Sequence, residues 1–448
     1  MSQNTESLIK QLYRMTWPML IGLLAIMSCQ LVDSAFIGQL GAKPLAALGF
    51  TIPVYQLIIG IQVGLGIATT TVISIALGAQ KYHYAKELGS LVIAAGFILI
   101  LVLCLLLWGN QKAIVVALGA NESLLPLIEE YWLPWLFGSW LGAMLYFGYS
   151  IFRAHGETFL PGMMMVLTSV LNMILDPIFI FVLDMGMAGA AWATICAFGT
   201  GCFIIYSFII RKHMIALPRS TPIIIIGLKR LVSFMTPAMM SQFIPPLSAM
   251  IATAIIASYG DVVVAAWGLG SRLEFFSIII VLALTMAMPP IIGRLRGSND
   301  FEQIHQLVKI AVGFVMMWQL VVALILMSIS TQLSSLLTSD TSVSIILNNY
   351  LWIVPLSFGA LGICMIMVSV CSAIGMPNLA LVISALRLFA CYLPLLWLGS
   401  EFAELNGLFI GAMLGNFLAG YMSWYIYKQY LQKLKLKHSG PVPKPQEN

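Results

Sequence analysis

Four polar residues lie within long apolar stretches of this sequence and are its main candidates for a functional site. Asp33 is the only acid in the stretch 17–37, and Asp176 lies in a later apolar stretch, four residues after Asn172. Thr194 belongs to the next apolar stretch along the chain. A charged carboxylate in the hydrocarbon core of a bilayer costs roughly 3 kcal/mol or more, so acids at that depth are normally paired, hydrated or functional. These residues therefore indicate a site that handles positive charge.

The expected depth of these residues favours a single site. Asp33 and Asp176 each lie seven residues from the expected outer end of a helix, which corresponds to a depth of about 10 Å. Asn172 shares a helix face with Asp176, because residues four apart are neighbours on a helix, and Thr194 is expected at a similar depth. If they converge, two carboxylates, an amide and a hydroxyl form an oxygen-rich cation site.

Two kinds of cation fit such a site. Removal from water favours the protonated form of a carboxylate, and two neighbouring acids resist being charged together, so the pair could take up and release protons. The same oxygens could instead ligate a hard cation such as sodium. A plainer interpretation is that each acid only hydrogen-bonds a helix end or a loop, which is most plausible for Asp176 because Pro177 follows it.

The elements that must position these residues are membrane-spanning helices. Of the 448 residues, 60% are hydrophobic and 9% are charged, whereas soluble proteins carry about 25% charged residues. A span needs about 20 apolar residues. Twelve segments meet this need, approximately at 14–39, 46–78, 88–108, 124–151, 160–183, 188–210, 230–258, 262–293, 306–328, 348–372, 378–399 and 407–430. The fold class is an all-α polytopic membrane protein.

Charge placement predicts the orientation in the membrane. The loops on the side of both termini hold most of the Lys and Arg residues, and the opposite loops hold only Lys43 and Lys112. Cytoplasmic loops carry the basic excess, so we expect both termini to be cytoplasmic. The net charge of +5 follows from this asymmetry and does not indicate nucleic-acid binding. The seven cysteines lie in apolar segments without CxxC pairs, which predicts buried side chains and no metal site.

The chain repeats itself at an offset of 219 residues. Pro18 matches Pro237, and Tyr131 matches Tyr350. Each half holds six expected spans, which predicts two six-helix bundles related by a pseudo-two-fold axis along the membrane normal. We expect an N-terminal bundle at 1–213 with the cation site, a cytoplasmic linker at 214–230, a C-terminal bundle at 231–438 and a disordered tail at 439–448.

The repeat also provides an internal control. The position equivalent to Asp33 is Ala252, so the second half is expected to fold without this acid. The second half has its own ionisable residues at membrane depth, namely Arg272, Glu274 and Arg387. Arg272 and Glu274 are two apart and do not face each other on a helix, so we expect structural ion pairs with other helices. Arg387 could either line a cavity or serve structure.

Several short runs in the first half are distinctive. They are WP at 17–18, LVD at 31–33, IGQLG at 37–41, LAALG at 45–49, NMILDP at 172–177 and GAAWAT at 189–194. The runs from 17 to 41 resemble the first helix of MATE multidrug and toxic compound extrusion transporters, and 45–49 continues the match. The runs at 172–177 and 189–194 resemble the family's fifth and sixth helices, with most similarity to the DinF-like branch, and the resemblance covers all twelve spans.

The resemblance implies cation-driven efflux of organic, often cationic, compounds. It assigns cation coupling to Asp33, Asn172, Asp176 and Thr194. Pro18 resembles the family's first-helix proline, where bending is proposed to accompany protonation, and a proline removes one helix hydrogen bond. Other branches place coupling acids in the seventh and tenth helices. This chain has Ser241 and Gln242 in the seventh and no acid in the tenth, so such a second-half ion site is not expected.

A substrate cavity is expected to include flexible and aromatic side chains. Met165 belongs to a run of three methionines, whose side chains adapt to many shapes, although an ordinary core or lipid-facing position is the plainer explanation. Tyr146 and Tyr149 could stack on a cationic drug. Tyr131 could do the same or anchor its helix at the membrane interface. Arg272, Glu274 and Arg387 complete the expected cavity set.

Taken together, these features predict a secondary antiporter that exports organic cations in exchange for protons. Sodium coupling at the same site and a lipid-precursor flippase of the same superfamily stay open as alternatives. An enzyme is not expected, because the spans lack a nucleophile–base pair, and the two-bundle repeat disfavours a channel. No Walker A loop is present, so we expect no cofactor and an ion gradient as energy source. We expect a monomer in the bacterial inner membrane, with small organic substrates.

Overall fold

A computed structural model describes residues 3–119 and 124–438, and these residues form helices and short connections without a strand. The expected disordered tail at 439–448 lies outside the described residues. Ten helical stretches are long and apolar enough to span a membrane. The stretch Pro377–Leu436 contains two spans, and Leu125–Ala154 supplies the twelfth among the described residues. The expectation of twelve transmembrane helices is confirmed.

The first half contains six spans and one short helix. The spans are α1 (Gln3–Gln39), α2 (Ala42–Gly78), α3 (Tyr82–Gly109), α5 (Leu125–Ala154), α6 (Phe159–Pro177) with the π-turn η2 (Ile178–Val182), and α7 (Gly186–Arg211); the short helix is α4 (Gln111–Ala117).

The second half repeats this plan with more breaks. Its helices are α8 (Thr221–Ala257), α9 (Asp261–Ser277), α10 (Ile279–Gly297), α11 (Phe301–Ser328), α12 (Ser330–Leu337), α13 (Thr341–Ile353), η3 (Val354–Ser357), α14 (Phe358–Ile374), α15 (Pro377–Ala385), η4 (Leu386–Tyr392) and α16 (Leu393–His438). Within α16 the backbone leaves the helical conformation at Ala403 and Glu404. The helix thus folds back there and provides two spans.

Helix boundaries follow the sequence repeat. α2 begins at Ala42 and ends at Gly78, and the α9–α10 pair begins at Asp261 and ends at Gly297, 219 residues later at both ends. α3 and α11 obey the same offset at both ends. The α9–α10 pair is therefore the second-half counterpart of α2, interrupted after Ser277.

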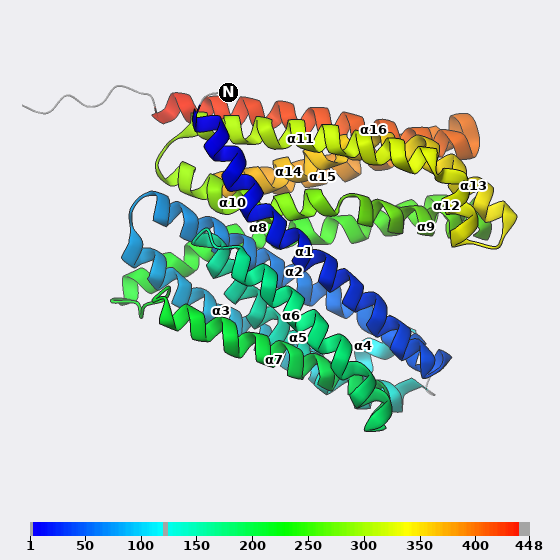
Figure 1. The fold of residues 1–448 in the computed structure, drawn as a ribbon, viewed down its shortest axis with the longest axis horizontal. Helices are drawn as coiled ribbons and strands as arrows, with labels where there is room; N and C mark the ends of the chain where they lie inside the picture. Colours follow the sequence, from blue (N-terminus) through cyan, green and yellow to red (C-terminus); the bar gives the residue numbers. More distant parts are fainter. Residues whose placement is uncertain (1–2, 120–123, 439–448) are drawn as a thin grey trace, which may run out of the picture.

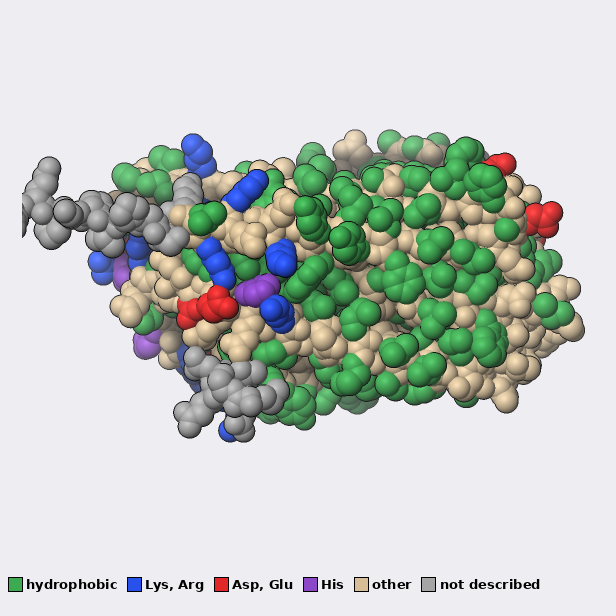
Figure 2. Space-filling model, turned by 90° about the horizontal axis from the view of Figure 1, so that it is seen from above, with side chains coloured by type: hydrophobic (Ala, Val, Ile, Leu, Met, Phe, Trp, Pro, Cys, Tyr) green, Lys and Arg blue, Asp and Glu red, His purple; other side chains and the backbone are tan. Residues whose placement is uncertain are grey.

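The two halves form two bundles that lie side by side, and the helices of both run roughly along the longest axis of the molecule (Figure 1). α2 of the first half contacts α8 and α10 of the second. Both ends of the described chain lie at the same end of the molecule, at the left in Figure 1, and Figure 2 shows Lys and Arg side chains gathered toward that end. We call it the basic end; it includes the start of α3, the end of α7 and the end of α10, with Lys81, Lys86, Lys212, Arg294 and Arg296.

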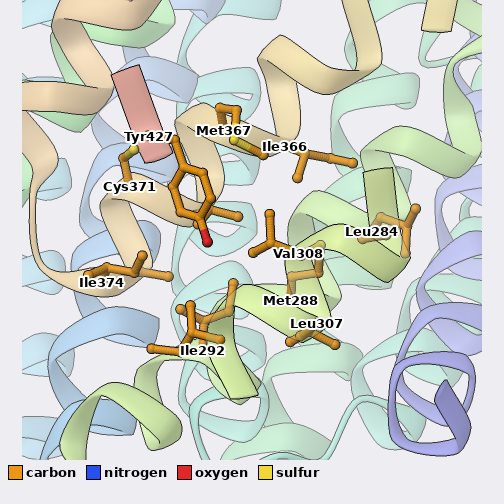
Figure 3. Close-up of a cluster of buried hydrophobic side chains, with 14 of the residues drawn as sticks. Leu284, Met288, Ile292, Leu307, Val308, Ile366, Met367, Cys371, Ile374 and Tyr427 are labelled. Atoms are coloured by element: carbon orange, nitrogen blue, oxygen red, sulfur yellow. The ribbon is translucent and has the colours of Figure 1, made fainter. Parts of the chain in front are cut away.

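Each half has a packed core of its own. In the second half, side chains from α10, α11, α14 and α16 interlock, among them Leu284, Val308, Met367 and Tyr427 (Figure 3). Lipid tails are as apolar as these side chains, so close van der Waals packing, rather than escape from water, holds such helices together.

Glycines allow the halves to approach closely at the basic end. A methyl group built on Gly78 of α2 would lie 2.1 Å from the carbonyl oxygen of Arg294 in α10. A methyl group on Gly297 would lie 2.3 Å from the carbonyl oxygen of Ile75. Backbone thus lies directly on backbone along this part of the interface, which we call the glycine seam.

The connection between the halves differs in extent from the expected linker. α8 begins at Thr221, so the second part of the segment 214–230 is helical. The first part is held against α3, because the backbone N–H of Ala216 donates to the carbonyl of Lys86 and Ser90 donates to the carbonyl of Ala216. α8 therefore begins nine residues before the expected seventh span, with the four isoleucines at 223–226 in its first turns.

Candidate ion-coupling site

Three helices of the first half bring the site together. α1 carries Asp33, α6 carries Asn172 and Asp176, and α7 carries Thr194. α6 contacts both α1 and α7. Gly162 helps α6 approach α1, because a methyl group there would lie 2.4 Å from the carbonyl oxygen of Pro18. Small residues at such crossings let helix backbones come close.

Asn172 is the centre of the hydrogen-bond network. Its side-chain amide donates to Asp176 Oδ1 at 3.0 Å and approaches Thr194 Oγ1 at 3.4 Å. The Thr194 hydroxyl in turn donates to the carbonyl of Ala190 at 3.0 Å. Three of the four residues expected at this site are thus joined, as the helical spacing of Asn172 and Asp176 indicated.

Cys29 completes the network and was not expected in it. Its Sγ donates to Asn172 Oδ1 at 3.0 Å, which links α1 to α6. The sequence suggested only a small buried side chain at this position. A signal was nevertheless present, because Cys29 precedes Asp33 by four residues, as Asn172 precedes Asp176, and such pairs share a helix face.

Each carboxylate keeps one buried oxygen without a hydrogen bond among the described residues. These atoms are Oδ1 of Asp33 and Oδ2 of Asp176. Asp176 is fully buried, and Asp33 is half-buried. The two side chains are near enough to repel each other when both are charged. Buried acceptors of this kind gain most from a proton or a small cation, since an unpaired buried acceptor costs about 1–3 kcal/mol.

Pro18 lies inside α1, about four turns before Asp33. Its carbonyl is covered by Gly162 of α6, and Gly22, one turn later, lies against the Met165 side chain. The proline and the carboxylates therefore sit on the same pair of packed helices. A bend of α1 at Pro18 must change how α1 contacts α6.

Most of the aromatic and methionine side chains expected in a cavity belong to the core instead. Tyr131, Tyr149 and Met165 are 5% exposed or less, and Tyr146 is half-buried. The guanidinium of Arg153 covers the Tyr146 ring at 5.0 Å. Tyr131, Tyr149 and Met165 therefore do not line an open cavity in this conformation. Hydropathy alone could not show this, because core, lipid and cavity faces of a helix are equally apolar.

The expected ion pairs of the second half are absent among the described residues, so that prediction was wrong. Glu274 instead accepts a hydrogen bond from the Tyr350 hydroxyl at 3.3 Å. Gly270, one turn earlier, makes room for the Tyr350 ring. Arg387 is near Glu274 but forms no ion pair with it, and its Nε is buried without a hydrogen bond. Arg272 is exposed.

Ala252, the counterpart of Asp33, is buried at 2% exposure in the second-half core. No group of three or more His, Cys, Asp or Glu that could hold a metal ion occurs in the described part of the chain. The two halves thus share their helix plan, and the polar network around Asn172 belongs to the first half alone. Such asymmetry favours a functional role over a structural one.

Twelve spans in two pseudo-symmetric bundles, with a pair of neighbouring acids in one of them, define a multi-pass membrane transporter of the two-bundle class. The family model MatE matches residues 18–178 and 237–398, two matches that begin 219 residues apart. The chain belongs to the MatE family of transporters.

Individual relatives agree with this membership. The chain is 31% identical to the FAD transporter of Shewanella oneidensis over 430 residues, which cover 95% of each chain. It is 27% identical to the multidrug export protein MepA of Staphylococcus saprophyticus over 75% of each chain. The crystal structure of the Vibrio cholerae MATE transporter VcmN in the bent form is similar with a TM-score of 0.95 and 54% identity, covering 97% of this chain and 99% of that one. Transport of small organic compounds is the activity that these similarities support.

Proposed function

We propose that this protein is an antiporter that exports small organic compounds in exchange for protons, which bind at Asp33 and Asp176. The observation that carries the proposal is the pair of buried carboxylate oxygens without hydrogen bonds, on two helices joined through Asn172 and Cys29. One proton on each carboxylate occupies a buried oxygen and makes the side chain neutral.

The site residues have separate roles in this mechanism. Asp33 and Asp176 exchange the protons, and the Asn172 amide holds the Asp176 carboxylate in place. Thr194 offers a hydroxyl that can donate or accept as the charge changes. Protonation removes the repulsion between the two acids and so allows α1 to shift against α6, with Pro18 as the point of bending. A cationic substrate is then released, because the negative charge that attracted it is gone.

The energy source follows from the proposed orientation. The basic end faces the cytoplasm by the charge rule for membrane proteins, so protons enter from the opposite end, nearer to Asp33. One proton moved inward at 100 mV supplies about 2.3 kcal/mol. We place the protein in the inner membrane of a bacterium, where a single chain carries out transport.

Proteoliposomes test this proposal directly. Purified protein is reconstituted into liposomes, and the liposomes are loaded with ethidium as the probe. Proton and sodium gradients are then imposed separately. We expect ethidium movement to require the proton gradient and to release protons on the substrate side. Asp33→Asn and Asp176→Asn should lose both, whereas Asp261→Asn, a change at the exposed start of α9, should retain them. Exchange that ignores the proton gradient and follows sodium would refute proton coupling.

Flavin export is a second candidate activity. The relative that is similar over 95% of this chain is named as an FAD transporter. FAD carries a diphosphate, which an arginine guanidinium can bind through two parallel hydrogen bonds. The same proteoliposomes, loaded with FAD in place of ethidium, decide whether this substrate is moved.

A further inference from the structure

Arg272 is a charged side chain in a setting that normally excludes charge. It lies eleven residues into α9, which corresponds to a depth of about 16 Å from the end of the helix opposite the basic end. Its side chain is exposed, and it takes part in no ion pair or hydrogen bond among the described residues. An arginine facing lipid at this depth would cost several kcal/mol. The face of α9 that carries Arg272 must therefore meet water or a ligand.

The two faces of α9 are clearly distinguished. Val263, Ala266 and Gly270 are buried, and Glu274 continues their line toward Tyr350. Ala265, Gly268 and Phe275 are exposed together with Arg272, at spacings of three and four residues. A methyl group on Gly268 would meet nothing within 4 Å. The exposed face therefore offers space beside the guanidinium and an aromatic ring one turn away.

The position of α10, which continues α9, shows where the exposed face of α9 points. After the break that follows Ser277, α10 runs on to the glycine seam, where it packs against α2 of the first half. Figure 1 shows α8 and α9 on the side of the second half that faces the first half. The exposed face of α9 thus points toward the space between the bundles and faces the half that carries Asp33.

We propose that Arg272 binds the anionic group, a phosphate or carboxylate, of a planar aromatic substrate, with Phe275 contacting the ring system. This inference rests on the proposed transport function and adds aromatic anions as a second substrate class beside the cations that the paired acids attract. A guanidinium matches phosphate and carboxylate geometry through two parallel hydrogen bonds, which a lysine cannot reproduce. The positive group stands on the half that lacks the paired acids, so it does not compete with proton binding directly.

Equilibrium binding without any gradient tests this assignment. Protein in nanodiscs of neutral lipid is titrated with FAD and, separately, with ethidium, both followed by fluorescence. Arg272→Gln should weaken FAD binding at least tenfold and leave ethidium binding unchanged, and Arg272→Lys should fall between. Ser271→Ala, at the neighbouring exposed position, is the matched control and should bind both probes as the unmodified protein does.

Each other outcome overturns the assignment. Unchanged FAD affinity in Arg272→Gln, equal loss of both probes, or no FAD binding by the unmodified protein would each exclude Arg272 as the anion-binding group. A second titration in nanodiscs with phosphatidylglycerol separates a substrate from a lipid headgroup as the source of the anion. FAD affinity should match that in neutral lipid, and displacement of FAD by the anionic lipid only when Arg272 is present would assign the residue to a lipid headgroup and overturn the proposal. Failure of this proposal is distinct from failure of proton coupling, because Asp33→Asn is assayed by exchange and Arg272→Gln by binding.

Discussion

At the residue scale, Asn172 determines how the site can respond to charge. Its amide nitrogen donates toward Asp176 and Thr194, and its oxygen accepts from Cys29. A carboxylate at position 172 would lose both donor contacts and place a third acid among the others. The neutral amide is therefore suited to a site whose two acids alternate between charged and protonated forms.

The Cys29 contact leads to a prediction about the link between α1 and α6. Cys29→Ala removes a buried hydrogen bond of about 0.5–1.5 kcal/mol, and we expect ethidium–proton exchange to slow by roughly two- to tenfold. Cys29→Ser should restore most of the rate, because a hydroxyl can donate to the same oxygen. The rate of exchange in proteoliposomes is the measurement.

Cys104 provides the matched control for this change. It is also a buried cysteine of the first half, and its Sγ lies 3.7 Å from the carbonyl of Leu136. Cys104→Ala should leave exchange unchanged. Equal rates for Cys29→Ala and Cys104→Ala would show that the α1–α6 link has no part in coupling.

Glu274 should behave differently from the acids of the first half. Its carboxylate accepts a hydrogen bond from Tyr350 and lies near Arg387. Glutamine keeps an oxygen that can accept from Tyr350 but removes the charge, and hydrogen bonds to charged groups contribute about 1.5–3 kcal/mol against about 0.5–1.5 kcal/mol for neutral ones. We expect Glu274→Gln to lower the thermal midpoint in detergent while ethidium–proton exchange per folded molecule persists. Loss of exchange at an unchanged midpoint would instead give Glu274 a role in transport.

At the element scale, the α1–α6 pair combines the bend and the site. Pro18→Ala restores a helix hydrogen bond and should insert and fold normally, but α1 would lose its preferred point of bending. We expect exchange to fall at least tenfold in proteoliposomes. Pro53→Ala, which removes a proline from within α2, is the control and should retain activity. Wild-type exchange by Pro18→Ala would end the bending proposal.

The helix plan could be predicted from the sequence, whereas the partners of several side chains could not. Span length and the 219-residue repeat follow from apolar runs, and helical rise alone placed Asn172, Asp176 and Thr194 at one level. Tyr131 and Tyr149 were harder, because nothing in an apolar helix distinguishes the face toward the core from the face toward a cavity. The same limit explains Glu274, since the room beside Gly270 for Tyr350 exists only after folding.

At the scale of the whole molecule, the glycine seam sets how the halves meet at the basic end. Gly78→Ala would press a methyl group against the Arg294 carbonyl, which is backbone and cannot move alone. Overpacking of this kind costs about 1–3 kcal/mol. A change of that size shifts an equilibrium between two conformations by roughly 5- to 150-fold. We therefore expect Gly78→Ala to favour conformations in which α2 and α10 separate at the basic end.

Hydrogen–deuterium exchange measures this shift in the purified protein. Peptides from the basic ends of α2 and α10, near residues 74–78 and 293–297, should exchange faster in Gly78→Ala, while peptides around Asn172 keep their protection. Gly49→Ala is the matched control, because it lies on the same helix and a methyl group there meets nothing within 4 Å. Equal exchange in the two variants would mean that the seam does not hold the halves together. Faster exchange throughout the Gly78→Ala protein would point to general unfolding, and would equally contradict a role for the seam in conformational balance.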